Sequence, residues 1–94
     1  MSEYDWCERP GSAVAHVLVV DDESHVRTLL VRWLTEAGCT CSEARDPDEA
    51  LDRLREQHTD VVTLDVRMPL GSGLDVVHRI AQKFPDTSIL MVTG

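Results

Sequence analysis

The chain alternates between short, fully apolar runs and longer segments whose apolar residues recur at helical spacing. The run His16–Asp22 (H-V-L-V-V-D-D) places four apolar residues, three of them β-branched, directly before two carboxylates. The run Val61–Asp65 (V-V-T-L-D) also ends in an acid, and Ser88–Val92 (S-I-L-M-V) is apolar after its first residue. Such runs predict strands that are buried on both faces.

The segments between these runs predict helices. After the first run, one segment has an apolar stripe at helical period, made of Val26, Leu29, Leu30, Trp33, Leu34 and Ala37. Gly38 then supplies a left-handed helix stop. The stretch Asp46-Pro47-Asp48-Glu49 combines an Asp cap, a proline in the first turn and a capping-box Glu, and predicts a helix to about His58.

A third helix is predicted before the last strand, with its apolar positions at Leu74, Val77, Ile80, Ala81 and Phe84. Pro85 ends it. Cys39–Ala44 is a weak strand by propensity, and its place between two helices favours a strand there. The resulting order βαβαβαβ predicts a parallel α/β sheet with right-handed crossovers.

The acids at the ends of the first and third strands are the candidate functional residues. Sites in open α/β sheets form at the carboxyl edge of the strands, so Asp21, Asp22 and Asp65 converge if these strands are neighbours. Their mutual repulsion would raise their pKa values unless a cation lay among them. The pattern therefore predicts a Mg²⁺ pocket in which one acid remains able to react.

The composition of the chain argues against some classes of function. The 94 residues suffice for one small domain, and a formal net charge of -8 argues against binding to nucleic acid or to an anionic membrane. Residues 1–12 are polar, include three acids and predict a flexible extension rather than a signal or transit peptide. No run approaches transmembrane length. Three cysteines without C-x-x-C spacing fit a reducing compartment, so we expect a cytoplasmic protein.

Four spaced signals give the chain a family resemblance. They are the pair Asp21-Asp22, then Asp65, then Met68-Pro69 followed by Gly73, and last Thr93 with Gly94. In this order the chain resembles, over Ala13–Gly94, the receiver domain of two-component response regulators. The resemblance implies a flavodoxin-like doubly wound sheet of order 2-1-3-4-5, which makes the first and third strands neighbours.

The resemblance also implies roles for individual residues. Asp65 would accept a phosphoryl group from a histidine kinase or a phosphotransfer protein. Asp22 and Asp65 would bind Mg²⁺ directly, Asp21 would act through a metal-bound water, and Arg67 would contribute its backbone carbonyl. The Thr93 hydroxyl would bind the phosphoryl group and signal phosphorylation. The chain would then be a signalling switch rather than a metabolic enzyme, limited to its own phosphorylation and dephosphorylation.

A departure from the family leaves alternatives open. The last helix-strand-helix of the family, with its phosphoryl-binding lysine, has no counterpart, so we expect an incomplete receiver domain over residues 13–94 with sheet order 2-1-3-4. Lys83 cannot substitute, because it is expected at the opposite edge of the sheet. The first alternative is an interaction module that cannot be phosphorylated and that dimerises or swaps elements through the exposed fourth strand. The second is a metal-dependent phosphatase, which Arg67 disfavours because that family has a second acid at this position.

Overall fold

The computed structural model describes residues 14–65 and 73–92. The expected extension over residues 1–12 therefore lies outside the described residues. Several residues that carried the sequence argument also lie outside them, namely Arg67, Met68, Pro69, Thr93 and Gly94.

Strands and helices alternate throughout the described residues, as the hydrophobic pattern predicts. The elements are β1 (His16–Val20), α1 (Ser24–Glu36), β2 (Thr40–Ala44), α2 (Pro47–Glu56), β3 (Val61–Asp65), α3 (Gly73–Lys83) and β4 (Ser88–Val92). The weak segment before α2 is a strand, as its position between two helices indicated.

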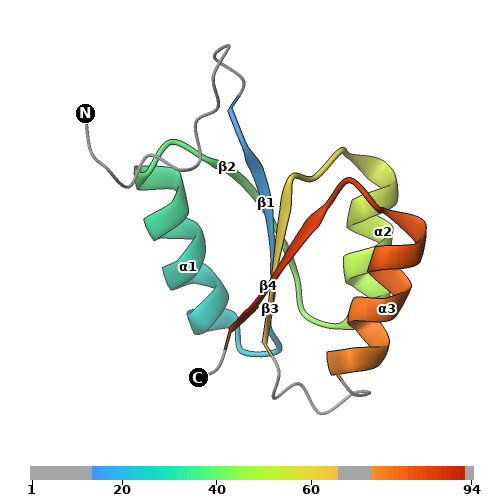
Figure 1. Ribbon diagram of the computed structural model, residues 1–94. Coiled ribbons are helices and arrows are strands. Elements are labelled where there is room, and N and C mark those ends of the chain that lie inside the picture. Colours follow the sequence, from blue (N-terminus) through green and yellow to red (C-terminus); the bar gives the residue numbers. More distant parts are fainter. Residues whose placement is uncertain (1–13, 66–72, 93–94) are drawn as a thin grey trace.

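The strands form one parallel sheet of order β2-β1-β3-β4, which confirms the predicted flavodoxin-like topology. In this order β1 lies between β2 and β3, with Val20 beside both Ala44 and Leu64. Helix α1 covers one face of the sheet, and α2 and α3 cover the other (Figure 1). The carboxyl ends of β1 and β3 therefore meet at the same edge.

Alternating residues of β1 enter two separate cores, one on each face of the sheet. Leu18 and Val20 belong to the core beneath α2 and α3, together with Ile80. Val17 and Val19 belong to the core beneath α1. All five β1 residues are buried, which explains why the sequence from Val17 to Val20 is continuously apolar.

The ends of the helices follow the local sequence. The backbone N–H of Glu49 donates to Oδ1 of Asp46 at 2.8 Å, so Asp46 caps α2 as predicted. The Glu49 carboxylate accepts from the backbone N–H of Arg45 at 3.1 Å, so the return bond of the capping box is made one residue earlier. Helix α2 ends at Glu56 rather than near His58. Gly38 has φ of 99°, the left-handed conformation expected after α1.

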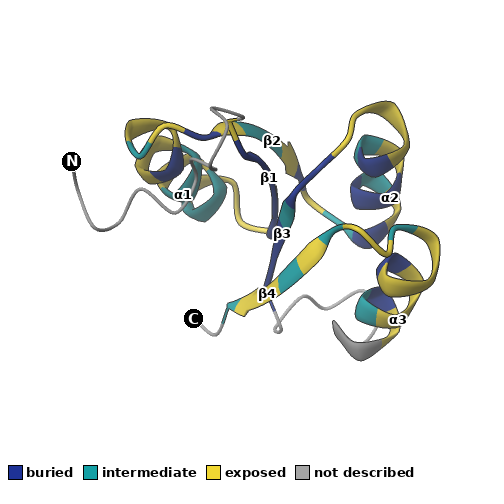
Figure 2. Cartoon of the chain, turned by 45° about the horizontal axis from the view of Figure 1, so that its top comes forward, coloured by how far each residue is buried: buried dark blue, intermediate teal, exposed yellow. Residues whose placement is uncertain are grey.

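Strand β4 differs from the expectation of a buried strand. Leu90 and Met91 are 52% and 39% exposed, whereas β1 and β3 are buried (Figure 2). The apolar stripe of α1 is also incompletely covered, since Trp33 is 56% exposed and Leu29 is 43% exposed. The physical reason is that α1 packs over β1 and β2, and no described element covers β4 on that face.

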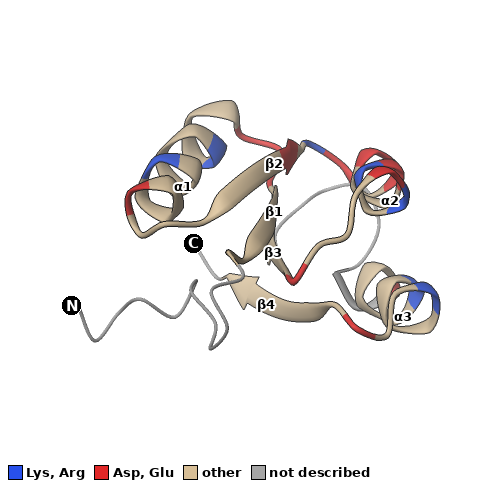
Figure 3. Cartoon of the chain, turned by 90° about the horizontal axis from the view of Figure 1, so that it is seen from above, with Lys and Arg blue, Asp and Glu red and all other residues tan. Residues whose placement is uncertain are grey.

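A groove of about 310 Å³ lies between α1 and β4. It is lined by Leu30, Trp33, Leu34, Ala37, Thr63, Leu90 and Val92. The hydroxyl of Thr63 is buried and has no hydrogen-bond partner among the described residues. Strand β4 carries no charged residue, and the Lys and Arg residues in the described part of the chain lie mainly on the helices (Figure 3).

Two further sequence expectations concern the environment of the protein. Cys41 is a free thiol, and the expectation of a reducing compartment stays a prediction. Among the described helices, none combines the length and the apolar character needed to cross a lipid bilayer.

Candidate functional site

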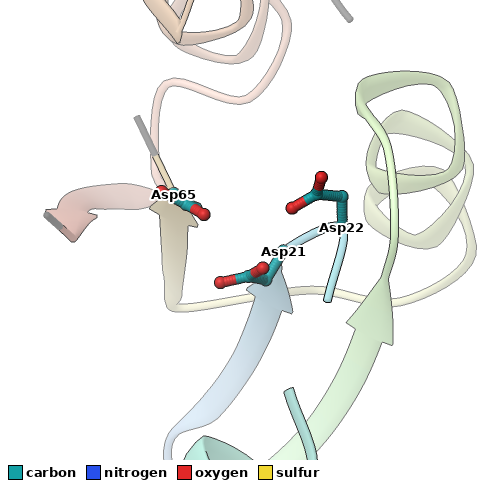
Figure 4. A group of neighbouring side chains, drawn as sticks. All are labelled: Asp21, Asp22 and Asp65. Atoms are coloured by element: carbon teal, nitrogen blue, oxygen red, sulfur yellow. The ribbon is translucent and has the colours of Figure 1, made fainter. Parts of the chain in front are cut away.

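Three carboxylates meet at the carboxyl edge of the sheet. Asp21 directly follows β1, Asp22 is the next residue in the loop, and Asp65 is the last residue of β3 (Figure 4). One carboxylate oxygen from each residue can be chosen so that the oxygens all lie within 4.8 Å of one another. The sequence prediction that these acids converge is therefore confirmed, and its cause is the adjacency of β1 and β3.

Asp21 is fixed in place by its backbone and its side chain. Its N–H donates to the carbonyl oxygen of Ala44 at 3.1 Å, which ties it to β2. Its Oδ1 accepts from the N–H of Glu23 at 2.9 Å, which ties it to the start of α1. Only 5% of Asp21 is exposed. This residue therefore has little freedom to move away from the other acids.

Burial raises the pKa of Asp21 above its ordinary value. The hydrogen bond from Glu23 opposes this rise, and the negative charges of Asp65 and Asp22 add to it. We expected repulsion between the acids to be the cause, but loss of water around the carboxylate contributes more. The fold therefore holds a carboxylate in a position where its negative charge is unfavourable.

The three acids differ in their access to solvent. Asp65 is 6% exposed and Asp21 is 5% exposed, whereas Asp22 is an exposed residue. A hydrated ion or a phosphoryl group can therefore approach from the side of Asp22. Asp65 would then be reached at the inner end of the site, in surroundings that contain less water.

The donor set fits Mg²⁺. Carboxylate oxygens are the hard ligands this ion prefers, and it keeps several waters when bound by one or two carboxylates. Two oxygens bound directly to one Mg²⁺ at about 2.1 Å can be at most about 4.2 Å apart. The separations of up to 4.8 Å need only a small side-chain adjustment, or a bridging water for one acid. Asp21, Asp22 and Asp65 would hold the ion.

One residue of the site was not identified from the sequence. Arg27, in the first turn of α1, donates from Nη1 to the backbone oxygen of Asp21 at 2.7 Å and from Nε to Oε1 of Glu43 at 3.2 Å. The available signal was a basic residue five positions after the acid pair, together with a glutamate near the end of β2.

Other candidate residues are not brought to the cluster by the described part of the structure. Arg67 and Thr93 lie outside the described residues, so their predicted roles are untested. Lys83 is the last residue of α3, just before the connection to the start of β4. It therefore lies toward the opposite edge of the sheet from the acids, as expected, and cannot reach them.

Comparison with known sequences gives a family match across most of the chain. The family described as response regulator receiver domain matches residues 17–94. A protein-glutamate methylesterase/protein-glutamine glutaminase of Caulobacter vibrioides is 37% identical over 78 residues, which cover 82% of this chain and 22% of that protein. The response regulator protein PilR of Pseudomonas aeruginosa is 40% identical over 77 residues, covering 82% and 17%. The chain thus spans less than a quarter of the length of these relatives.

Solved structures agree with the sequence comparison. A response regulator receiver protein from Pseudomonas putida has a TM-score of 0.81 at 33% identity, covering 88% of this chain and 70% of that chain. The response regulator TrrA of Thermotoga maritima, in complex with Mg²⁺-BeF, has a TM-score of 0.79 at 39% identity, covering 85% and 70%. The same regulator in complex with the histidine kinase ThkA has a TM-score of 0.79 at 38% identity, covering 86% and 70%.

Proposed function

Because the chain belongs to the response regulator receiver domain family, we propose that it accepts a phosphoryl group on Asp65 and acts as a signalling switch. The observation that carries this proposal is the convergence of three carboxylates, two of them buried, at the carboxyl edge of β1 and β3. Such a cluster contributes nothing to packing, and a bound cation would offset the repulsion among its charges.

The reaction we propose is a direct phosphoryl transfer. A carboxylate oxygen of Asp65 forms a bond to the phosphorus of a phosphohistidine, and the P–N bond breaks. The imidazole leaves with the electron pair of that bond and takes up a proton. The product is an aspartyl phosphate, an acyl phosphate that water later cleaves to regenerate the Asp65 carboxylate.

Each acid has its own part in this step. Asp65 is the nucleophile, because its position at the end of β3 brings its carboxylate to the edge of the sheet where a phosphoryl group would enter. Asp22, on the exposed side, would hold Mg²⁺ together with Asp21 and Asp65, and the ion would offset charge on the transferring oxygens. We further propose that Arg67 contributes its backbone carbonyl to the ion and that the Thr93 hydroxyl donates to the phosphoryl group.

The proposed phosphodonor is a histidine kinase or a phosphotransfer protein. The complex of TrrA with the histidine kinase ThkA supports this choice, because TrrA and this chain are 38% identical and share the sheet that carries the acids. Receiver domains are signalling domains, so the only chemistry we propose for this chain is its own phosphorylation and dephosphorylation.

The acceptor residue can be identified chemically. Borohydride reduces an aspartyl phosphate to homoserine, which peptide mass spectrometry distinguishes from aspartate. We expect homoserine at Asp65 after phosphorylation by a small-molecule phosphodonor with Mg²⁺. Homoserine at Asp21 or Asp22 instead would contradict the assignment of the nucleophile.

The exposure of β4 favours a second function, which is association with another copy of the chain. No described residue pairs with the outer edge of this strand, and Leu90, in the middle of the strand, is 52% exposed. An apolar strand edge of this kind readily pairs with another chain. We propose that the chain forms a homodimer, by edge pairing or by exchange of elements through β4, whether or not it is phosphorylated.

A further inference from the structure

Arg27 joins the loop that carries the acids to strand β2. Its Nη1 donates to the backbone oxygen of Asp21 at 2.7 Å, and its Nε donates to Oε1 of Glu43 at 3.2 Å. The Arg27 side chain is only 16% exposed, while that of Glu43 is 45% exposed. The guanidinium is therefore held by a backbone acceptor and a side-chain acceptor rather than moving freely in solvent.

The oxygen that Arg27 binds belongs to the peptide unit that leads into Asp22. A peptide unit is planar, so a hydrogen bond to its oxygen fixes the orientation of the whole unit. That orientation sets the direction in which the Asp22 side chain leaves the backbone. Packing does little to fix this side chain, because Asp22 is exposed. The contact from Arg27 is thus well placed to orient Asp22 toward Asp65.

We propose that Arg27 is a positioning residue that holds the Asp21–Asp22 peptide in the orientation needed for Mg²⁺ binding, with Glu43 as its anchor on β2. The inference rests on the proposed function of the acid cluster. The choice of arginine is explained by its planar guanidinium, which donates in two fixed directions at once. A lysine ammonium carries the same charge on a flexible stem and lacks that geometry.

The test compares the Mg²⁺ affinity of two variants by isothermal titration calorimetry on the unphosphorylated chain. Arg27→Met removes the contact. Arg32→Met is the matched control, since Arg32 lies on the same helix, is 74% exposed and pairs only with Glu36 at 3.6 Å among the described contacts. Mutation of a residue that hydrogen-bonds to a metal ligand typically weakens metal binding at least about tenfold. We therefore expect Arg27→Met to bind Mg²⁺ about tenfold more weakly than the wild type, and Arg32→Met to bind it as the wild type does.

A third variant separates geometry from charge. Arg27→Lys keeps the positive charge, and we expect its Mg²⁺ affinity to fall clearly below that of the wild type. Wild-type affinity in this variant would mean that the charge alone matters, and would overturn the positioning role. Thermal unfolding without Mg²⁺ reports any loss of stability separately, and Arg27→Lys decides the matter if Arg27→Met does not fold.

The outcomes for the inference and for the proposed function can be distinguished. If the wild-type chain binds no Mg²⁺, both are overturned. If the wild-type chain binds Mg²⁺ and the Arg27→Met and Arg32→Met variants bind it equally well, the inference alone is overturned. Weaker binding in both Arg27 variants, with the control unchanged, supports it.

Discussion

Asp21 and Asp65 are both buried, and they sit at the carboxyl ends of two adjacent parallel strands, where their carboxylates face a shared space. The hydrogen bonds between β1 and β3 hold the backbones of these two residues together. The two like charges are therefore kept close to one another by the pairing of β1 with β3. Their proximity is unfavourable for stability, and a divalent cation bound between them would remove the cost.

Replacing Asp21 tests whether its charge lowers the stability of the metal-free chain and supports metal binding. The raised pKa of Asp21 means that its charged form is less favourable in the folded state than in the unfolded state. Its charge therefore destabilises the fold at neutral pH, and this effect disappears as the pH falls and the carboxylate is protonated. We expect Asp21→Asn to stabilise the metal-free chain by roughly 1 kcal/mol, about 4–8 °C in Tm.

The same variant should lose stabilisation by Mg²⁺. Mg²⁺ at ten times its Kd would stabilise the wild-type chain by about 1.4 kcal/mol, and Asp21→Asn much less. Thermal unfolding with and without Mg²⁺ measures both effects. Asp86→Asn is the control, because Asp86 is exposed in the turn before β4, at the opposite edge of the sheet. Equal stabilisation of Asp21→Asn and Asp86→Asn by Mg²⁺ would argue against a metal site at Asp21.

His16 predicts a dependence of stability on pH. Its ring nitrogens lie 2.6 Å from Oγ1 of Thr40 and 2.9 Å from Oγ of Ser42, and the residue is 7% exposed. Burial lowers the pKa of His16, the carboxylate of Asp60 opposes this shift, and His58 adds to it. The neutral ring is therefore the form that the folded state favours.

The sign of the effect follows from this shift. Above the ordinary histidine pKa of about 6.5, both states hold a neutral ring and the full stability is present. Below it, the unfolded state binds a proton more readily, so stability falls until the folded-state pKa is reached. Urea unfolding at about pH 7.5 and about pH 5.5 should show a smaller decrease in His16→Gln than in the wild type. His78→Gln, at an exposed position on α3, should retain the wild-type decrease; a flattened response there would refute the assignment to His16.

Association through β4 is tested by placing a charge on it. Leu90→Glu puts a carboxylate on the exposed face of the strand edge, and we expect it to weaken dimerisation at least about tenfold, measured by sedimentation equilibrium. Val14→Glu is the matched control, because Val14 is also 52% exposed but precedes β1. A wild-type chain that stays monomeric at high concentration would contradict the proposal outright.

The acid cluster could be predicted from the sequence because it depends on local signals and a simple topology. The runs that end in Asp21 and Asp65 identify buried strands, and parallel strands bring their carboxyl ends to one edge. Only the adjacency of β1 and β3 was needed in addition, and the family resemblance supplied it. The cap at Asp46 was predictable for the same reason, since its partner Glu49 is three residues away.

Features that depend on distant partners could not be predicted. Arg27 and His16 bind residues on β2 that are far along the chain, and spacing within one segment does not identify those partners. The burial of Leu90 and Trp33 was expected from their apolar character, but burial depends on whether another element packs over them. Hydrophobic periodicity identifies which face of an element is apolar, and it does not identify what covers that face.

In the proposed function, Asp65 accepts a phosphoryl group with the help of a divalent cation. The most direct measurement is the intact mass of the chain after incubation with a small-molecule phosphodonor, with and without Mg²⁺, beside an Asp65→Asn control. We predict the gain of one phosphoryl group that requires both Asp65 and Mg²⁺. No gain from the folded wild-type chain, or an equal gain in Asp65→Asn, would contradict the claim.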